Sequence, residues 1–336
     1  MSMEELLRPF VGCDSGESDT VQIMKFCLQL AYVLPFGFLY LSFMITIVKR
    51  RKDRELFEDS FFTLHIVDGI ITLYFLISDI GFFRLTSYVR PVCEYLVPIL
   101  KDPSYKLTPF YTLYMYAQLA KMLSTLAMSI NRYTSVNNPV HHKMFWLKYC
   151  NKIIITIFII PVFCVWPVVI GTTSFMPLNG TGVINYEHKI PWARTTYGRL
   201  LVSVSTLVFT IFSSIVTSSK LRKIGGNMKK VEFSMNVATV FTACGFFLVA
   251  ILQVIYLTVN TETMLDKMWI AKWIMAATQI GNDFYMLSGP VVLIILDKRM
   301  RSSICCCIKK QSNSRRATKA SVQPITMVHS NVNWNT

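Results

Sequence analysis

Charged side chains are scarce in this chain of 336 residues. Only 16% of the residues are Asp, Glu, Lys or Arg, whereas 53% are apolar. A soluble domain carries roughly 25% charged residues, and the mean hydropathy here is clearly positive, at +0.44. These values exclude an ordinary soluble fold and indicate that most of the chain lies in a bilayer.

Motifs that support catalysis are also missing. The sequence holds no His-Glu-x-x-His pair, no Gly-x-Ser-x-Gly, no glycine-rich phosphate loop and no Cys/His spacing typical of a metal site. We therefore expect neither an enzyme nor a bound metal or cofactor. Nucleic-acid binding is disfavoured despite the net charge of +15, because the basic residues straddle apolar segments and suit contact with anionic lipid.

What the sequence does contain is a series of apolar runs long enough to cross a hydrocarbon core, which takes ~20 residues each. Seven such runs are joined by short loops. We therefore predict an all-α membrane protein formed by one bundle of seven transmembrane helices. The runs are Ile23–Val48, Ser60–Phe83, Pro109–Ile130, Ile153–Phe175, Leu200–Ser219, Val237–Val259 and Met268–Leu296.

The distribution of Lys and Arg predicts how the bundle is oriented. The loops and tail on the N-terminal side carry nine of these residues, and the opposite side carries twenty-two. Positively charged loops stay cytoplasmic, so the N-terminus is predicted outside and the C-terminus inside. Residues 1–22 would be an extracellular segment, residues 23–297 the membrane domain and residues 298–336 a disordered cytoplasmic tail. The polar, acidic start lacks the pattern of a signal peptide.

Several residues suit covalent modification on one side of the membrane or the other. Cys13 and Cys93 both fall on the predicted outer, oxidising side. The sequence does not decide whether they form a disulfide or remain two separate thiols. Asn179-Gly180-Thr181, also on that side, is an N-glycosylation acceptor. After the last helix, a run of three thiols beside basic residues favours S-acylation over reduced thiols. These thiols are Cys305, Cys306 and Cys307.

Ionisable groups within membrane spans are costly, by ~2.5–3.5 kcal/mol each on insertion scales, so each is a candidate for function. Asp68 lies 11 residues past Phe57, and Lys121 lies 11 residues before Arg132. At the rise of an α-helix both would be roughly 16 Å deep. Equal depth predicts a buried ion pair between Asp68 and Lys121, the alternative being that each is hydrated separately.

Asp283 lies two helical turns outward of Pro290 in the last predicted helix. It could bind a cationic group of a ligand or pair with an internal Lys, and both interpretations stay open. In contrast, Lys25, Asp79 and Lys272 lie near the ends of their spans, where we expect them to reach water.

A candidate ligand pocket combines aromatic and polar residues of the third and seventh helices. Its proposed lining is Tyr114, Gln118, Gln279 and Asp283, because an apolar cavity with a few polar groups is what a small-molecule site needs. Aromatic belts at the membrane interface produce a similar composition. For residues near the outer boundary, such as Trp273, the belt interpretation is favoured.

The third predicted helix ends in Asn131-Arg132-Tyr133, with Val136 and Pro139 following. This string resembles the Asp-Arg-Tyr-x-x-Val-x-x-Pro signature of rhodopsin-like G-protein-coupled receptors in residue type, spacing and predicted membrane side. More closely, the whole chain resembles nematode serpentine chemoreceptors of the class gamma superfamily (the class gamma, V and U group). The residues that carry this likeness are Ser60-Phe61-Phe62-Thr63-Leu64, Asn131-Arg132-Tyr133, Pro139, Lys143 and Trp146.

The resemblance implies roles for particular residues. Arg132 would reach an inner cavity where the C-terminus of a G-protein α-subunit docks. Lys121 stands where rhodopsin-like receptors help coordinate a sodium ion, so its ammonium would replace that ion. Asn131 replaces the acid of the signature, which removes the charged clamp on Arg132. The expected coupling surface combines Asn131, Arg132 and Tyr133 with basic residues of the third inner loop. These are Lys220, Arg222, Lys223, Lys229 and Lys230. The alternative is that these loop residues form only a solvated basic rim.

Together these observations predict a chemosensory G-protein-coupled receptor that binds a small extracellular ligand and activates a heterotrimeric G protein. It would be a multi-pass protein of the plasma membrane and, by the resemblance, of the ciliary membrane of sensory neurons. Membrane lipid is an expected partner, and a receptor dimer is left open. Two alternatives are a seven-helix ligand-gated ion channel, which the charge asymmetry disfavours, and a transporter, which would show internal repeats.

Overall fold

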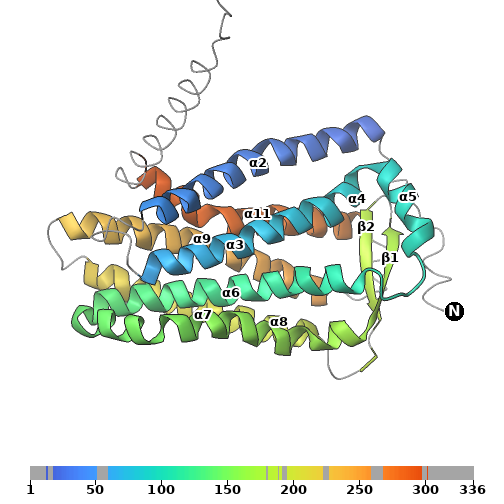
Figure 1. Cartoon of the computed structure of the whole chain (residues 1–336). Coiled ribbons are helices and arrows are strands. Elements are labelled where there is room, and N and C mark those ends of the chain that lie inside the picture. Colours follow the sequence, from blue (N-terminus) through green and yellow to red (C-terminus); the bar gives the residue numbers. More distant parts are fainter. Residues whose placement is uncertain are drawn as a thin grey trace, which may run out of the picture.

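The computed structural model describes residue 13 and residues 18–50, 60–178, 181–187, 189–190, 195–221, 227–258, 268–296 and 301. Within these residues, seven long helical rods lie side by side, and a two-stranded sheet covers one end of them (Figure 1). The predicted helical bundle is therefore confirmed. The rods are α2 (Asp19–Arg50), a continuous run of α3 (Ser60–Ser78), η2 (Asp79–Arg84) and α4 (Leu85–Tyr88), α6 (Thr108–Asn137), α7 (Pro139–Ile170), α8 (Thr195–Leu221), α9 (Asn227–Thr258) and α11 (Met268–Leu296).

Several predicted boundaries were wrong. The second rod continues past Phe83 to Tyr88, so Arg84 lies inside a helix rather than in a loop. The inner loop expected after Arg132 is reduced to Asn138, because α7 starts directly at Pro139, a residue whose fixed φ suits the first helical position. α7 also ends earlier than predicted, at Ile170.

A β-hairpin that the sequence did not predict follows α7. β1 (Thr172–Leu178) and β2 (Thr181–Glu187) pair antiparallel. Phe175, which was assigned to the fourth helix, is therefore in a strand, and its side chain is 2% exposed. Gly171 ends the helix with extended backbone, and the Thr-rich sequence after it favours strand over helix.

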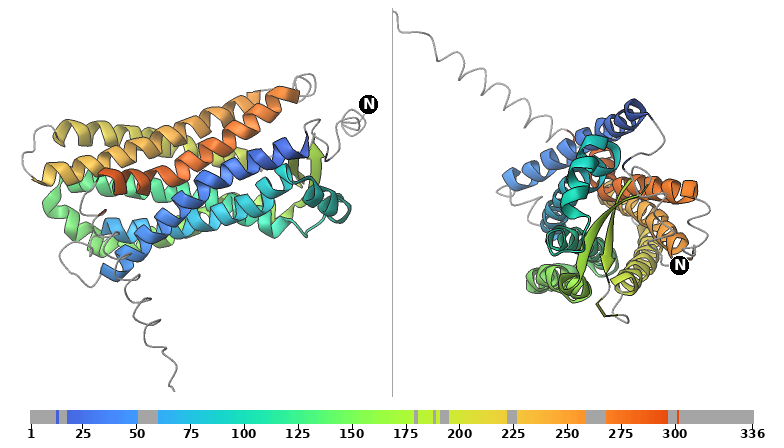
Figure 2. Two further views of the ribbon diagram at one scale, coloured as in Figure 1. Left: turned by 90° about the horizontal axis from the view of Figure 1, so that it is seen from above. Right: turned by 90° about the vertical axis from the view of Figure 1, so that its right-hand side faces the viewer.

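The hairpin lies across the end of the bundle, as the end-on view in Figure 2 shows. β1 contacts the short helix α5 (Arg90–Leu100) and α6, and β2 contacts α4. Thr108 at the start of α6 has its hydroxyl 3.2 Å from that of Thr173. The Tyr186 hydroxyl donates a hydrogen bond to the Pro167 carbonyl at 2.5 Å, and burial raises the pKa of Tyr186. We call this end, where the sheet lies, the hairpin end.

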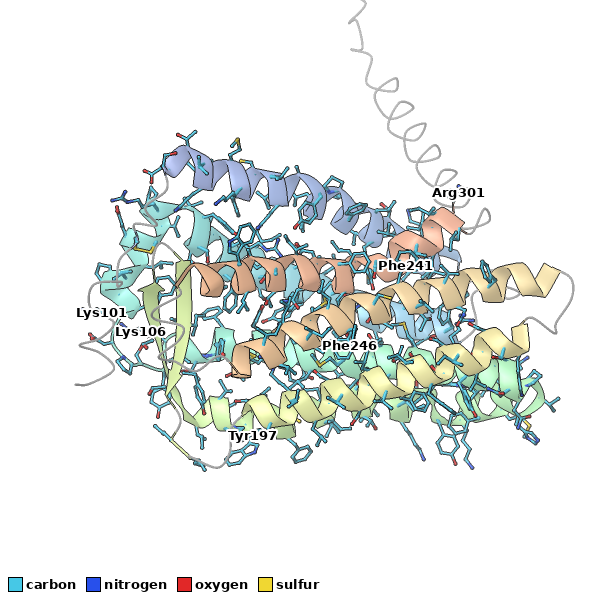
Figure 3. The ribbon with its side chains drawn as sticks, turned by 180° about the vertical axis from the view of Figure 1, so that it is seen from behind. Lys101, Lys106, Tyr197, Phe241, Phe246 and Arg301 are labelled. Atoms are coloured by element: carbon cyan, nitrogen blue, oxygen red, sulfur yellow. A yellow bond between two sulfur atoms is a disulfide. The ribbon has the colours of Figure 1, made fainter. Side chains whose placement is uncertain are left out.

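The opposite end carries Arg132, near the C-terminus of α6, and we call it the Arg132 end. Figure 3 shows Lys101 and Lys106 at the hairpin end and Arg301 close to the Arg132 end. A helix of this kind rises 1.5 Å per residue, so Thr108 and Arg132 are separated by roughly 36 Å along α6. The two ends of the bundle are therefore at opposite sides of a span as thick as a bilayer.

α6 is the central helix of the bundle. It packs against α3, α7 and α8, and most of its polar residues point into the interior. Five stretches of the described residues are long and apolar enough to cross a membrane, and none of them belongs to α6: Asp19–Lys49, Ser60–Tyr88, Pro139–Ile170, Tyr197–Lys220 and Ala276–Leu296. Helices that face lipid must be apolar, whereas a surrounded helix can hold polar groups that pair with its neighbours.

α9 and α11 approach each other closely at Gly245. A Cβ atom at this position would lie 2.6 Å from Cδ1 of Phe284 and 3.0 Å from the backbone Cα and N of Tyr285. Only a residue without a side chain fits so close to the backbone of another helix. This contact fixes the spacing of the sixth and seventh rods beside α6.

Candidate ligand site and coupling end

A turn of π-helix in the second rod brings two buried charged residues, Asp79 and Arg84, together. In an α-helix, side chains five residues apart point about 140° away from each other. η2 has the wider π-helical turn over Asp79–Arg84, which brings these two residues onto one face. Nε of Arg84 lies 2.5 Å from Oδ2 of Asp79. π-helical turns of this kind are frequent at functional sites.

Arg84 also binds Asp283 from α11. Its two terminal nitrogens contact Oδ1 and Oδ2 of Asp283 at 2.5 Å and 2.9 Å. The exposed fractions of Arg84, Asp79 and Asp283 are 0%, 2% and 3%. A guanidinium held by two carboxylates, one of them bidentate, is a strong and geometrically specific arrangement. It connects the second rod with the seventh.

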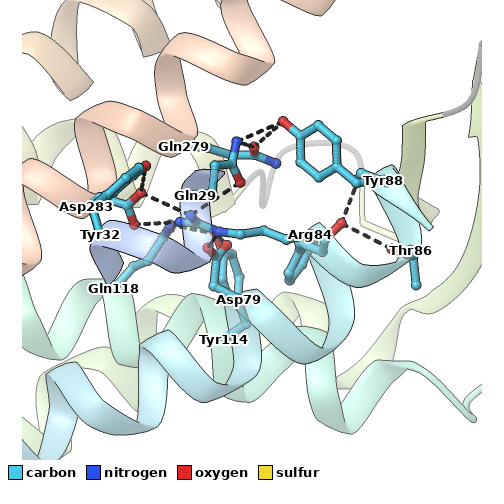
Figure 4. A network of polar contacts seen from close by, with 12 residues as sticks. Gln29, Tyr32, Asp79, Arg84, Thr86, Tyr88, Tyr114, Gln118, Gln279 and Asp283 are labelled. Carbon is cyan, nitrogen blue, oxygen red and sulfur yellow. Dashed lines mark hydrogen bonds and ion pairs between the residues drawn. The ribbon is translucent and has the colours of Figure 1, made fainter. Parts of the chain in front are cut away.

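Neutral polar side chains extend this cluster toward the hairpin end (Figure 4). The Tyr32 hydroxyl of α2 donates to Oδ2 of Asp283 at 2.6 Å. The Tyr88 hydroxyl donates to Oε1 of Gln279 at 2.8 Å, and Nε2 of Gln29 donates to the Tyr88 oxygen at 3.0 Å. Three rods therefore contribute to one polar network, which we call the Arg84 network.

The four residues predicted to line a ligand pocket all lie in or beside the Arg84 network. Asp283 and Gln279 belong to it directly. The Tyr114 hydroxyl lies 3.4 Å from Oδ1 of Asp79, and Nε2 of Gln118 donates to the Tyr114 oxygen at 3.3 Å. The structure therefore brings these residues together from α6 and α11. By contrast, Trp273 is 70% exposed and fits the interfacial belt.

Asp283 does have an internal cation as its partner, but this cation is Arg84 and not the Lys that one interpretation expected. The expectation that Asp79 reaches water was also wrong, since it is buried against the same guanidinium. Sequence reasoning missed both residues because it treated the second span as an α-helix ending at Phe83. The available signal was an Asp and an Arg five residues apart at the end of an apolar run.

Deeper in the bundle, Lys121 of α6 meets Asp68 of α3. Nζ of Lys121 is 2.6 Å from Oδ2 of Asp68 and 3.0 Å from the Thr72 hydroxyl. The Tyr40 hydroxyl donates to the same Asp68 oxygen at 2.7 Å. Lys121 and Asp68 are 2% and 1% exposed. The two residues that the depth argument paired are therefore in contact, with neutral groups that satisfy part of their hydrogen-bonding capacity.

A small cavity adjoins this ion pair, between α3, α6, α9 and α11. Asp68, Lys121, Thr242 and Pro290 are among its lining residues, and the space that water can reach is about 30 Å³. One water molecule needs ~10–15 Å³ of such space, so the cavity is of the size of a few waters. Oδ1 of Asp68 is buried there and accepts no hydrogen bond from the described residues.

At the Arg132 end, the residues Asn131-Arg132-Tyr133 contact α3 and α8. Nδ2 of Asn131 donates to the Ser60 hydroxyl at 2.7 Å. The guanidinium carbon of Arg132 lies 3.5 Å from the ring centroid of Phe61, and Arg132 is only 4% exposed. Tyr133 faces the aromatic ring of Phe212 on α8, at 6.1 Å between centroids. Arg132 is thus stacked on the second rod.

Comparison with known proteins places these features in a family. A model of the Srg family chemoreceptors matches residues 26–304.

The chain belongs to the Srg chemoreceptor family.

Its relatives include serpentine receptor class gamma-13 of Caenorhabditis elegans, 25% identical over 94% of this chain and 93% of the relative. Serpentine receptor class gamma-14 of the same organism is 26% identical over 93% of each chain. Serpentine receptor class gamma-15 is 26% identical over 87% of this chain and 89% of the relative. This Srg family member is therefore a multi-pass membrane protein with a chemosensory role, and the resemblance predicted from Asn131-Arg132-Tyr133 is confirmed.

The hairpin end of this Srg chemoreceptor carries a disulfide. Cys13 and Cys93 are bonded, with their Cα atoms 5.9 Å apart, although they are 80 positions apart in sequence. Cys93 is 1% exposed and packs with Leu107 and Phe175 in a small apolar cluster. Of the two possibilities that the sequence left open for these cysteines, the structure forms the bond.

The remaining predicted sites are only partly described. Lys220 is exposed near the end of α8, at the Arg132 end. Arg222, Lys223, Asn179 and the three thiols after the last helix lie outside the described residues. The proposed coupling loop, glycosylation and acylation therefore stay predictions from the sequence.

Proposed function

We propose that this Srg family member is a plasma-membrane receptor that binds a small ligand at the hairpin end and activates a heterotrimeric G protein at the Arg132 end. The arrangement of α6 carries this proposal. The same central helix holds Tyr114 and Gln118 beside the Arg84 network and, about four to five turns further on, Asn131, Arg132 and Tyr133. A ligand that moves α6 at one end therefore moves the residues of the other.

Two independent observations support the proposed orientation. A disulfide between Cys13 and Cys93 forms in an oxidising compartment, which favours an extracellular hairpin end. The loops at the Arg132 end carry the excess of Lys and Arg that is typical of the cytoplasmic side. Asn179 is then extracellular and available for glycosylation. By the family, we extend the location to the ciliary membrane of sensory neurons.

Signalling would proceed by a shift between two bundle states. The structure has Arg132 stacked on Phe61, which we assign to the resting state. A ligand that binds more tightly to a state with Arg132 released shifts the population toward that state. The released guanidinium, with Asn131, Tyr133, Lys220, Arg222 and Lys223, would then contact the G-protein α-subunit.

The coupling step is tested by expressing the receptor with G proteins and screening a panel of small metabolites with cAMP and cGMP readouts. We expect a ligand-dependent signal that Arg132→Ala removes. The matched control is Lys148→Ala, which removes an exposed basic side chain on the adjacent helix at the same end. A signal that survives Arg132→Ala, or that both variants lose equally, contradicts the assigned role of Arg132.

Orientation is tested separately by glycosidase digestion of the receptor from eukaryotic cells. We expect a mobility shift on gels that Asn179→Gln abolishes. If Asn179 is instead protected as a cytosolic residue, the receptor orientation fails and the ion-channel alternative gains.

A further inference from the structure

Arg199, in the hairpin half of the bundle, has no acidic partner among the residues that the structure describes. Arg199 lies in the second turn of α8, half-buried, and NH1 of its guanidinium contacts the sulfur of Met115 at 3.2 Å. Its Nε is shielded from solvent and donates no hydrogen bond to any of the residues that the structure describes. A thioether sulfur is a weak acceptor, so the buried Nε has no described partner and NH1 has only a weak one.

Two buried cations of this half and of the core are instead bound by carboxylates. Arg84 binds Asp79 and Asp283, and Lys121 binds Asp68. A guanidinium remains charged at all accessible pH values, and a buried charge without a counterion is strongly destabilising. In the part of the chain that the structure describes, Arg199 has no carboxylate contact of this kind, and its described contact is to sulfur. The described contact of buried Arg132 is likewise not to an acid but to the ring of Phe61.

Arg199 faces the polar side of α6 that lines the candidate ligand site. Its described contact, Met115, lies three residues before Gln118 on the same face of α6. One turn further, Oε1 of Gln118 is buried and accepts no hydrogen bond from the described residues, although Nε2 of the same amide is used. An unused donor on α8 and an unused acceptor on α6 thus lie on the same flank of the bundle.

We propose that Arg199 is the anchor for an acidic ligand, whose carboxylate it binds with its planar fork. Gln118 would accept a hydrogen bond from a hydroxyl or amide donor of the same molecule. Guanidinium and carboxylate match in geometry and charge, and both bonds are charge-assisted. Because the two carboxylates of the Arg84 network are already held by Arg84, Arg199 remains available. This assignment rests on the proposed receptor function and specifies the chemical class of its ligand.

The test uses the purified receptor in nanodiscs of neutral phosphatidylcholine and follows its thermal unfolding. The probe is para-hydroxybenzoate, which has a carboxylate and a hydroxyl donor, and the matched neutral compound is para-hydroxybenzamide. We expect the carboxylate to raise Tm by about 2–4 °C near ten times its Kd, and the amide to have little effect. Arg199→Gln should abolish this rise, and Arg199→Lys should retain part of it.

Arg90→Gln is the matched control, because Arg90 is a half-exposed arginine of the hairpin end that already pairs with Glu94. It should leave the rise in Tm unchanged. If Arg199→Gln does not fold, the comparison of the carboxylate with the amide on the wild-type receptor, together with Arg199→Lys, still decides the question. Equal shifts with both probes, no shift with the carboxylate, or a carboxylate shift that survives Arg199→Gln would overturn the proposal.

An anionic lipid headgroup has the same chemistry and is distinguished by a second arm. Nanodiscs that contain phosphatidylglycerol are compared with phosphatidylcholine alone, without the probe. A rise in Tm that depends on Arg199 and appears only with phosphatidylglycerol overturns the soluble-ligand assignment. None of these binding experiments contains a G protein. A negative result in them therefore does not affect the coupling assay with Arg132→Ala, which tests the proposed function independently.

Discussion

The guanidinium of Arg84 binds both oxygens of the Asp283 carboxylate, at 2.5 Å and 2.9 Å. The two residues are 199 positions apart in sequence, and both are buried. A wider π-helical turn in η2 positions Arg84 to contact Asp79 and Asp283 together. This contact joins the second and seventh rods beside the candidate ligand site.

Removal of Arg84 should destabilise the receptor severely. Arg84→Gln leaves Asp79 and Asp283 buried without their cation, and such a loss costs about 3–5 kcal/mol. We expect low surface expression and a much reduced Tm of the purified protein. Arg90→Gln, which removes a half-exposed arginine, should have little effect. Equal behaviour of the two variants would show that the buried cluster contributes nothing to stability.

The Asp68–Lys121 pair should show strong coupling in a double-mutant cycle. Lys121→Met leaves an uncompensated carboxylate, whereas Asp68→Asn together with Lys121→Met removes both charges. We therefore expect the single variant Lys121→Met to reach the cell surface less well than the double variant. Surface labelling measures this difference. Losses that simply add would mean that the two charges do not interact.

The Cys13–Cys93 bond should stabilise the hairpin end. It closes a long loop, and loss of a native disulfide typically costs about 2–5 kcal/mol. We expect Cys13→Ser and Cys93→Ser each to lower Tm, and the double variant to be no worse than Cys93→Ser alone. Non-reducing mass mapping of the wild-type protein checks the bond directly. A double variant with twice the loss would show that the cysteines act separately.

Phe61 should restrain Arg132 in the unliganded receptor. A buried cation–π contact of this kind is worth about 2 kcal/mol, which corresponds to roughly a thirty-fold change in the ratio of receptors with Arg132 stacked on Phe61 to receptors with Arg132 released. Phe61→Leu should therefore raise basal G-protein activation, whereas Phe61→Tyr should preserve the contact and the low basal level. The control is Phe62→Leu, which removes the neighbouring ring and should leave basal signalling close to wild type.

Gly245 and Gly37 should respond in opposite directions to alanine. A Cβ at Gly245 would meet the backbone of Tyr285 at 3.0 Å, whereas nothing lies within 4 Å of a Cβ at Gly37. Gly245→Ala should separate α9 from α11 and lower Tm. Gly37→Ala should raise stability by about 0.5–1 kcal/mol, because it reduces the freedom of the unfolded helix segment. Thermal unfolding in nanodiscs measures both, and a neutral Gly245→Ala would refute the close approach.

The sequence by itself determined the class of the protein and much of its outline. Long apolar runs cannot be exposed to water, so the seven helices follow from composition. The string Asn131-Arg132-Tyr133 indicated the family together with Ser60–Leu64, Pro139, Lys143 and Trp146. Matching depth predicted the contact of Asp68 with Lys121, since both are held by regular helices whose rise is known.

Only the tertiary structure decided which charges face each other in the hairpin half. Arg84, Asp79 and Arg199 lie close to span ends, where sequence alone cannot distinguish a charge that reaches water from one that turns inward. The direction of the Arg84 side chain depended on the π-helical turn in η2. The position of Arg199 depended on the packing of α6 against α8. Hairpin formation by Thr172–Glu187 likewise depended on contacts with α4, α5 and α6, because a two-stranded sheet gains stability only when it packs on other elements.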